Sequence, residues 1–410
     1  MNLLFLSPCI PKINGVGWEQ RAFHFLKGYS QIAKVDLICI NFGNTTLDET
    51  EHFHLTQLCK SFQVFEIDQV FSNANPLTSI KRIFTPNPLF STVVLNSNFQ
   101  KELSKYIATA DFIHTSRLET FAFLPKEVWA KTLLDLDECH VTTLRRKQRF
   151  DFNASLMQRV QNLLRYFDTF RIAYYQKKVI EQVAAAFICS AVEQNRVSSS
   201  LRLQILPNVA RSVPSLTSIV DPQQERLLFV GNLSTPANID AVLYFVNQVW
   251  GKVLEQYSTC RLMIVGRDPC DEILALAGFE GIEIHANVAD LDEVYQNATI
   301  ALVPLRFGAG TKLKLLEAFG YGVPVVSTSI GCEGLDDVQN EIHLLVADSA
   351  EAFAEACLRL LTELETRQQL ALAAWEYVRR NHDAAAVQQM ITTRLSELAS
   401  IAATQTPELP

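Results

Sequence analysis

The stretch from Val303 to Thr328 constrains the fold and chemistry of this chain more than any other. Its sequence is VPLRFGAGTKLKLLEAFGYGVPVVST. The apolar run Ala298 to Val303 predicts a buried parallel strand before it, and Val323 to Ser327 predicts a second strand. Anionic ligands bind at the carboxyl edge of such sheets, where a helix N-terminus adds backbone N–H groups. The stretch therefore predicts an anion-binding loop between two parallel strands.

The residues of this loop suit a ligand that carries both phosphates and hydroxyls. Lysines supply positive charge, and Glu317, about one turn into the predicted helix, can accept hydrogen bonds from hydroxyls. A nucleotide sugar has both groups. The alternative is an ordinary tight turn before a helix whose lysines face water. The candidate contacts are Gly308, Gly310, Thr311, Lys312, Lys314 and Glu317.

Length and composition fit a two-domain globular protein. The chain has 410 residues, 48% of them hydrophobic and 20% charged, which is too long for one ordinary core. Its nine cysteines follow no C-x-x-C or histidine-rich pattern, which favours a reducing compartment and argues against structural zinc. We recognise no signal peptide and no apolar run of the ~20 residues that a membrane helix needs. A cytoplasmic protein is the simplest expectation.

Apolar runs alternate with helical patterns in both halves, which predicts parallel, doubly wound α/β sheets. We predict a first domain over residues 1–209, a linker over 210–224, a second domain over 225–383, and a C-terminal helix and tail over 384–410. The principal predicted helices are Trp18–Tyr29 and Asn238–Glu255. The predicted strands are Leu3–Leu6, Val35–Ile40, Asp111–His114, Thr132–Leu136, Ala184–Cys189, Leu203–Leu206, Arg226–Val230, Leu262–Val265, Ile282–His285, Ala298–Val303, Val323–Ser327 and Ile342–Val346.

Residues 145–178 form a basic segment in an otherwise acidic chain. It has nine Lys/Arg and two acidic residues, interleaved with aromatic and aliphatic side chains. Such a helix can rest peripherally on an anionic membrane at its inner face. The alternative, which we favour here, is a long helix with its apolar side packed on the domain core. Nothing resembles a nucleic-acid recognition module.

Several motifs together resemble glycosyltransferase family 4. The first is Leu316-Glu317-Ala318 followed by Gly322, Pro324, Val325, Val326 and Ser327. PANIDAVLYF (Pro236 to Phe245) looks like a bacterial subgroup of that family with a Pro-x-Asn segment, and DLDECHVTTLRR (Asp135 to Arg146) resembles another segment of it. ILPNV (Ile205 to Val209) looks like the family's exit from its first domain.

The resemblance implies the GT-B fold, with two facing Rossmann-like domains, a cleft between them, and a C-terminal helix that packs back on the first domain. It also implies sugar transfer from a nucleotide diphosphate sugar to an acceptor hydroxyl, with retention of anomeric configuration and without a metal or other cofactor. The partners would be the donor and an unknown glycan, lipid or small-molecule acceptor.

This chain departs from the family at three positions in the second domain. Asn232 stands where the family has Arg, Pro236 to Asn238 stand where it has Lys, and Ala309 replaces the first of two glutamates. We expect Lys312 and Lys314 to replace the cations, with Arg306 or Arg267 as helpers. Lysines two apart cannot both face a phosphate from a regular helix, and we favour Lys312, which leaves Lys314 structural or solvent-facing.

The resemblance also suggests contacts in the first domain. Gly15 and Gly17 would face the diphosphate, flanked by Asn14 and Trp18. His114 corresponds to a histidine that the family places near the reacting sugar, although a lone histidine at a strand end is often structural. Arg117 and Glu119 are further candidate acceptor contacts.

Two other functions stay open. The missing polar groups fit a catalytically silent GT-B binding or scaffold protein, and a nucleotide-sugar 2-epimerase shares the fold but needs a second Glu/His set that we do not find. An oxidoreductase is disfavoured because Gly231-Asn232-Leu233 is no G-x-G-x-x-G motif. The pair Asp135 and Asp137 closes a predicted strand, so we assign no metal to it.

Overall fold

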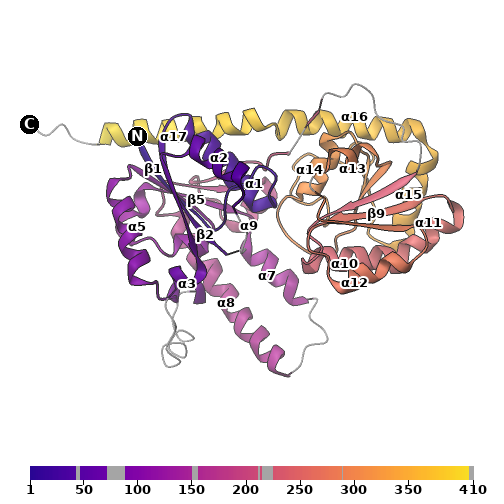
Figure 1. The fold of residues 1–410 in the computed structure, drawn as a ribbon, viewed down its shortest axis with the longest axis horizontal. Helices are drawn as coiled ribbons and strands as arrows, with labels where there is room; N and C mark the ends of the chain where they lie inside the picture. Colours follow the sequence, from indigo (N-terminus) through magenta and orange to yellow (C-terminus); the bar gives the residue numbers. More distant parts are fainter. Residues whose placement is uncertain are drawn as a thin grey trace, which may run out of the picture. The chain divides into compact units, whose positions relative to one another are not determined.

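The computed structural model divides the chain into two compact units. The first comprises Met1–Pro207 with Ala384–Pro410, and the second Asn208–Asp383. Figure 1 colours the chain from indigo to yellow along the sequence. Most of the predicted linker lies outside the described residues, as do residues 150–155 of the basic segment. The structure describes residues 1–42, 47–71, 88–149, 156–210, 213–214, 225–288 and 290–405.

The first unit contains a seven-stranded parallel sheet in the order β3-β2-β1-β4-β5-β6-β7. Its strands are β1 (Asn2–Ser7), β2 (Lys34–Asn41), β3 (Ser61–Glu66), β4 (Phe112–Ser116), β5 (Thr132–Asp137), β6 (Ala185–Ile188) and β7 (Leu203–Ile205). Its helices are α1 (Gly17–Ser30), α2 (Glu49–Leu58), α3 (Ile67–Val70), α5 (Ser97–Thr109), α6 (Leu118–Phe121), α7 (His140–Arg149), α8 (Leu156–Ile180), α9 (Ala191–Val197) and α17 (Ala384–Gln405), with 3₁₀ turns η1 (Leu89–Thr92) and η2 (Lys126–Lys131).

The second unit contains a six-stranded parallel sheet in the order β10-β9-β8-β11-β12-β13. Its strands are β8 (Arg226–Val230), β9 (Arg261–Gly266), β10 (Ile282–Ala286), β11 (Ile300–Val303), β12 (Val325–Ser327) and β13 (Leu345–Val346). Its helices are α10 (Pro236–Tyr244), α11 (Gly251–Gln256), α12 (Asp271–Leu274), α13 (Asp292–Gln296), α14 (Leu313–Gly320), α15 (Ala350–Thr362) and α16 (Leu364–Asn381), with a π-helical turn η3 (Phe245–Trp250) and a 3₁₀ turn η4 (Ala275–Gly278).

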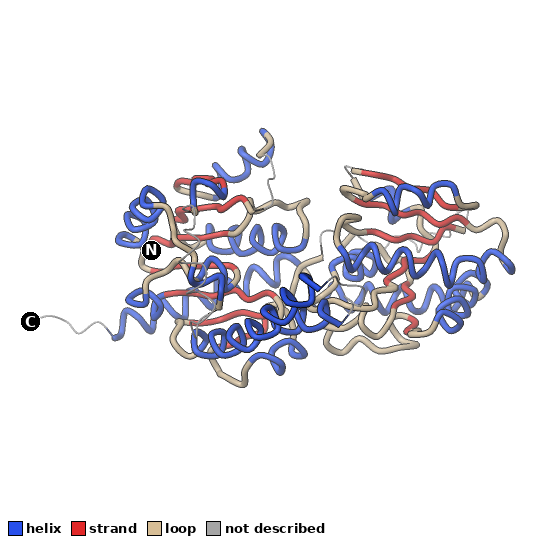
Figure 2. The backbone as a smooth tube through the Cα atoms, turned by 90° about the horizontal axis from the view of Figure 1, so that it is seen from below, coloured by secondary structure: helices blue, strands red, loops and turns tan. Residues whose placement is uncertain are grey.

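The structure confirms the α/β class and the two doubly wound sheets. Figure 2 shows helices in blue beside the red strands of each sheet. Two predictions were incomplete. The strand β3 was missed because its SFQVFE sequence contains no continuous apolar run. Its residues lie at the sheet edge and are only half-buried. The predicted helix Asn238–Glu255 is interrupted by the π-helical turn η3.

Each sheet starts in its middle, and this topology positions the candidate site. The strand β8 lies between β9 and β11, so the chain leaves β8 in one direction and later returns to its other side. The loops that follow β8 and β11 therefore lead away from each other at the carboxyl ends of these strands, and this switch point, called the crevice below, is the usual ligand position in doubly wound sheets. In the first unit, β1 and β4 form the corresponding pair.

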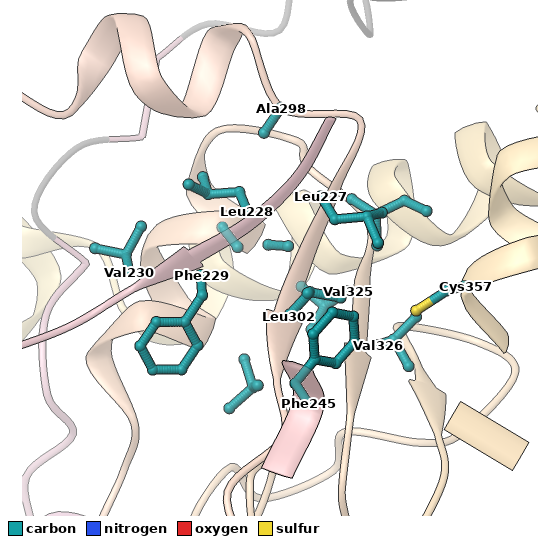
Figure 3. Packing of buried hydrophobic residues seen from close by; sticks show 14 of the residues in the cluster. Leu227, Leu228, Phe229, Val230, Phe245, Ala298, Leu302, Val325, Val326 and Cys357 are labelled. Atoms are coloured by element: carbon teal, nitrogen blue, oxygen red, sulfur yellow. The ribbon is translucent and has the colours of Figure 1, made fainter. Parts of the chain in front are cut away.

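The core of the second unit surrounds β8. Leu227, Leu228, Phe229 and Val230 are all buried, as expected for a parallel strand covered on both faces. Figure 3 shows these residues with Leu302 of β11 and Val325 of β12. Because four consecutive side chains are packed, β8 is a rigid support for the loop that follows it.

The C-terminal helix α17 packs on α1 of the first unit. A methyl group placed on Gly28 would lie 2.9 Å from Ile391 Cγ2, so the two helices approach closely. Gln388 Nε2 lies 3.2 Å from His24 Nδ1 in the same interface. Among the described residues, no helix combines the length and apolar character that crossing a membrane requires.

Candidate functional site

The crevice between β8 and β11 holds the Lys314 amine. Lys314 is the second residue of α14, and its Nζ donates to Asn238 Oδ1 of α10 at 2.8 Å. The same Nζ lies 4.0 Å from the centroid of the Phe229 ring, a cation–π distance. A methyl group on Gly231 would be 2.9 Å from this Nζ, so glycine is needed where β8 ends. We expected Lys314 to be structural or solvent-facing, and its part-buried amine, bonded to Asn238, fits the first of these alternatives.

Asn238 and Asn232 organise the loop that follows β8. Asn238 Nδ2 donates to the Asn232 carbonyl oxygen at 2.8 Å, which directs the Asn238 amide oxygen toward Lys314. Asn232 Oδ1 accepts from the backbone N–H of Ser234 at 2.9 Å and from its hydroxyl at 2.6 Å. The side chain of Asn232 therefore stabilises a turn, and the sequence pattern had not singled out Asn238 as a partner of a lysine.

The surroundings of Lys314 change its proton affinity. Burial, opposed by Glu317 and assisted by the nearby Lys312 charge, lowers the pKa of the Lys314 amine to about 7. The ordinary pKa of a lysine is about 10.4. The amine therefore titrates near neutral pH, where a bound anion would hold it in its charged form.

Glu317 lies one turn further along α14 and is nearly covered, with 5% of its surface exposed. Its Oε2 accepts from the Tyr295 hydroxyl at 3.0 Å, and Tyr295 stacks on Tyr321 with ring centroids 4.8 Å apart. This arrangement fixes the carboxylate from α13. Sequence reasoning missed Tyr295, because α13 has no motif that links it to Glu317.

The glycine loop between β11 and α14 is braced by its own side chains. Gly308 and Gly310 have φ values of 128° and 69°, a region that favours glycine. Lys312 Nζ donates to the carbonyl oxygens of Ala309 at 2.8 Å and Gly310 at 2.6 Å. Thr311 Oγ1 donates to the Gly334 carbonyl at 3.0 Å. The amine of Lys312 thus contacts the loop, whereas the amine of Lys314 lies in the crevice.

The two predicted helper arginines differ in their contacts. Arg306 forms a two-point ion pair with Asp240 of α10, with Nε 2.9 Å from Oδ2 and Nη2 bonded to Oδ1, and it stacks over the Tyr244 ring at 4.9 Å. Its charge is therefore already paired. Arg267 follows β9, and its carbonyl accepts from the Leu233 N–H at 2.8 Å. Arg267 lies on the loop beside the one that carries Asn232.

His114 lies in the core of the first unit. Its side chain on β4 has no exposed surface, and it packs against the rings of Phe5 and Phe25 at 4.3 and 4.5 Å. Its Nδ1 is 3.0 Å from the Tyr29 hydroxyl and its Nε2 is 3.2 Å from Ser116 Oγ. The predicted contact with a sugar gains no support from this position, because both ring nitrogens are engaged and covered.

The glycines of the first unit shape the entry to α1. Val16 N donates to Glu19 Oε2 at 2.8 Å, and the Gly15 carbonyl accepts from Gln20 Nε2 at 2.8 Å. Gly17 is the first residue of α1. A carboxylate of the chain itself therefore occupies the backbone N–H of Val16, which lies between the two glycines that were predicted to face the diphosphate.

Arg117 lies at the carboxyl end of β4, near Trp18. Its guanidinium carbon is 4.8 Å from the centroid of the Trp18 ring, and its backbone has a φ of 71°. Glu119 follows and lies 3.6 Å from His140 Nε2. Arg117 and Glu119 lie together with Leu136 and His140, beyond the ends of β4 and β5. Asn14 is exposed.

Asp135 forms a buried ion pair. Arg21 Nε and Nη2 donate to its carboxylate at 2.7 to 3.0 Å, and Arg21 Nη1 donates to the Leu206 carbonyl at 2.9 Å. Asp137 Oδ1 lies 3.6 Å from Arg21 Nε. Within the described ranges, no three His, Cys, Asp or Glu side chains converge as metal ligands.

The basic segment forms two helices, α7 and α8, and its apolar side is only partly packed. Ile172, Tyr175 and Val179 are buried. In contrast, Phe167, Phe170 and Tyr174 are 55%, 49% and 68% exposed. The favoured prediction of a long helix packed on the core therefore holds for part of α8, and the exposed aromatic residues depart from it, because periodicity alone does not show which apolar face meets the core.

A family model matches the second unit. Residues 224–363 match the family described as Glycosyl transferases group 1. A stretch of 165 residues is also 30% identical to an uncharacterized 44.6 kDa protein in the cps region of Klebsiella pneumoniae, covering 38% of this chain and 42% of that relative. The match spans less than half of either protein, and the name of the relative states no activity.

Solved structures match nearly the whole chain. A sucrose-phosphate synthase from Thermosynechococcus elongatus has a TM-score of 0.65 at 16% identity, covering 98% of this chain and 100% of its own. Anabaena HepE in complex with UDP and glucose has a TM-score of 0.61 at 12% identity, covering 97% and 100%. A glycosyltransferase from Rickettsia africae has the same TM-score and 12% identity, covering 97% and 98%. These structures confirm the predicted GT-B fold.

Proposed function

We propose that this protein transfers a sugar from a nucleotide diphosphate sugar to an acceptor hydroxyl, with retention of anomeric configuration and without a metal. The main observation in support of this proposal is the position of the Lys314 amine in the crevice between β8 and β11. The match of residues 224–363 to Glycosyl transferases group 1 supports it, because that range contains the whole crevice. HepE, which shares the fold, binds UDP and glucose.

The chemistry requires stabilisation of the departing diphosphate. As the anomeric C–O bond breaks, negative charge grows on the leaving group, so fixed cations and N–H donors there lower the barrier. Lys314, the glycine loop and the N-terminus of α14 would serve this purpose without a metal. Glu317 would accept hydrogen bonds from donor hydroxyls, and Tyr295 would hold its carboxylate in place.

A donor panel tests the proposal. UDP, GDP, ADP and dTDP sugars are assayed for binding and hydrolysis with the wild type and with Lys314→Ala, Lys312→Ala and Glu317→Ala. We expect at least about a tenfold loss in each variant, since a hydrogen bond to a charged group contributes about 1.5–3 kcal/mol. Lys312→Ala would act through the loop that it braces. Lys252→Ala, which removes a lysine of α11 whose amine pairs with Glu351 of α15, is the control.

The outcomes separate the candidate functions. Binding without turnover of any donor or acceptor would support a scaffold protein instead. Exchange of the sugar C2 proton with solvent would support an epimerase. Unchanged binding and turnover in Lys314→Ala and Glu317→Ala would overturn the site assignment.

We further propose polysaccharide biosynthesis in the cytoplasm, with an acceptor that is a glycan or is linked to lipid at the membrane. The relative from the cps region is consistent with this setting. The exposed aromatic face of α8 suits membrane contact, because residues 167, 170 and 174 are spaced along one helix side. Lys177 and Lys178 are exposed beyond it, and Arg145 lies 5.8 Å from the Phe170 ring centroid.

Vesicle flotation tests this peripheral contact. We expect binding to vesicles with anionic lipid at low salt, weaker binding at high salt, and little binding to neutral vesicles. The triple variant Phe167→Ser, Phe170→Ser and Tyr174→Ser should lose it. Phe53→Ser, an exposed aromatic on α2, is the matched control. Failure of the wild type to bind anionic vesicles at low salt would refute the membrane proposal.

A further inference from the structure

The helix α10 contacts two cations near the crevice in opposite ways. At one position, Asp240 pairs its carboxylate with Arg306 and neutralises that charge. Two residues earlier, Asn238 meets Lys314 with an uncharged amide oxygen at 2.8 Å. A carboxylate at position 238 would pair with Lys314 as Asp240 pairs with Arg306. The neutral amide leaves the charge of Lys314 available.

The amide of Asn238 has a defined orientation. Its Nδ2 donates to the Asn232 carbonyl, so its oxygen must face the amine that approaches from α14. The Phe229 ring of β8 lies against the Lys314 amine, and the missing side chain of Gly231 leaves room for this amine. Three elements, β8, α10 and α14, therefore fix one position for the Lys314 Nζ at the carboxyl edge of the sheet.

We propose that Asn238 is a positioning residue that holds the Lys314 amine toward the donor diphosphate without placing a carboxylate of α10 against it. This inference rests on the proposed function. It also explains a departure from the family pattern, since the Pro-x-Asn segment that stands in place of a lysine orients a lysine from another helix. Asn238 acts through Lys314 and is assigned no contact with the substrate.

A consequence is that donor binding depends on pH near neutrality. The charged groups that act on Lys314 are Lys312 and Glu317 of its own segment, while Asn238 of α10 and Phe229 of β8 are uncharged. With a pKa of about 7, the charged fraction of the amine falls about tenfold between pH 6 and pH 8. Affinity for a diphosphate whose charge is constant in this range should fall with it.

The experiment combines lysine NMR with binding. The pKa of the Lys314 amine is measured in full-length protein with ¹³C-labelled lysine, its signal being assigned by its absence in Lys314→Arg. Asn238→Asp places a carboxylate on the amine and should raise this pKa by about 1–3 units. Asn238→Leu removes the oxygen and should change both this pKa and the lysine chemical shift. Asn98→Asp, an exposed Asn on α5 of the first unit, adds the same charge elsewhere and should change neither.

Binding of UDP-glucose, whose diphosphate stays ionised throughout, is measured from pH 6 to pH 8.5. We expect the wild-type affinity to fall several-fold with rising pH. In Asn238→Asp the affinity should be weaker at pH 6 and nearly independent of pH, because the carboxylate competes with the diphosphate. An unchanged Lys314 pKa in both Asn238 variants would overturn the positioning role. If UDP-glucose does not bind, the NMR result still decides that role, whereas the donor panel alone decides the proposed function.

Discussion

Single buried histidines make the stability of the first unit depend on pH. Burial lowers the pKa of His114 well below its ordinary value of about 6.5, and burial with the charges of Lys27 and Arg21 lowers that of His24 to about 4. At a pH between the ordinary pKa and the lowered pKa of each histidine, the unfolded chain binds a proton that the folded unit excludes. Stability is therefore full above about pH 6.5 and falls as the pH drops, because the unfolded state binds more protons.

We expect the free energy of unfolding to decrease below pH 6.5 by about 1.4 kcal/mol per pH unit for each such histidine. Urea unfolding at a series of pH values measures this slope. His114→Gln should lower the free energy of unfolding at neutral pH. It should also make the dependence on pH shallower by about 1.4 kcal/mol per pH unit, the contribution of one proton. His54→Gln, at an exposed position of α2, is the control. An identical slope in wild type and His114→Gln would show that His114 is protonated in the folded unit.

At the scale of elements, α17 contributes an apolar stripe to the first unit. Val387, Ile391 and Leu395 are buried and recur every four residues, which places them on one side of the helix. Met390, the neighbour of Ile391, is 45% exposed, whereas Ile391 is 2% exposed. The helix is thus held on α1 by a narrow contact that single substitutions can probe.

Ile391→Ala should destabilise the first unit by about 2–5 kcal/mol, because it leaves a cavity against Gly28. Met390→Ala should change stability by less than about 0.5 kcal/mol, since its side chain is largely in water. Thermal and urea unfolding measure both variants. Equal effects of the two substitutions would mean that α17 does not pack on α1 in solution.

At the scale of the whole molecule, the chain passes from the first unit to the second and returns. The first unit is completed by residues 384–410, whereas the second is continuous. Truncation after Asp383 should therefore weaken the first unit alone. Hydrogen exchange should show lost protection in α1 and unchanged protection in β8 and β11. Uniform loss of protection in both units would contradict this division.

The candidate site was predictable in part. Glycines, lysines and Glu317 in one loop after an apolar strand were sufficient to locate an anion site, because a parallel sheet presents such loops at its carboxyl edge. The choice between Lys312 and Lys314 was not predictable from their spacing. Residues two apart point to different sides of a helix, and only the position of Asn238 and Phe229 shows which side lies on the crevice.

His114 illustrates the same limit. The segment DFIH predicts a strand correctly, but a strand pattern does not reveal which of its ends is covered by Phe5, Phe25 and Tyr29 from other elements. The exposed aromatic face of α8 was missed for a related reason. Helical periodicity identifies apolar positions, and the packing partner decides which of them are buried.

The sequence by itself determined the α/β class, the positions of most strands along the chain and the place of the predicted anion-binding loop, because these follow from local apolar periodicity and from glycine and turn chemistry. Tertiary structure alone decided that Lys314 is the enclosed cation, that Asp240 neutralises Arg306, and that Tyr295 holds Glu317. These pairs join residues 22 to 76 positions apart. Their energies depend on distance and burial, which arise only when the sheet brings separate loops to one edge.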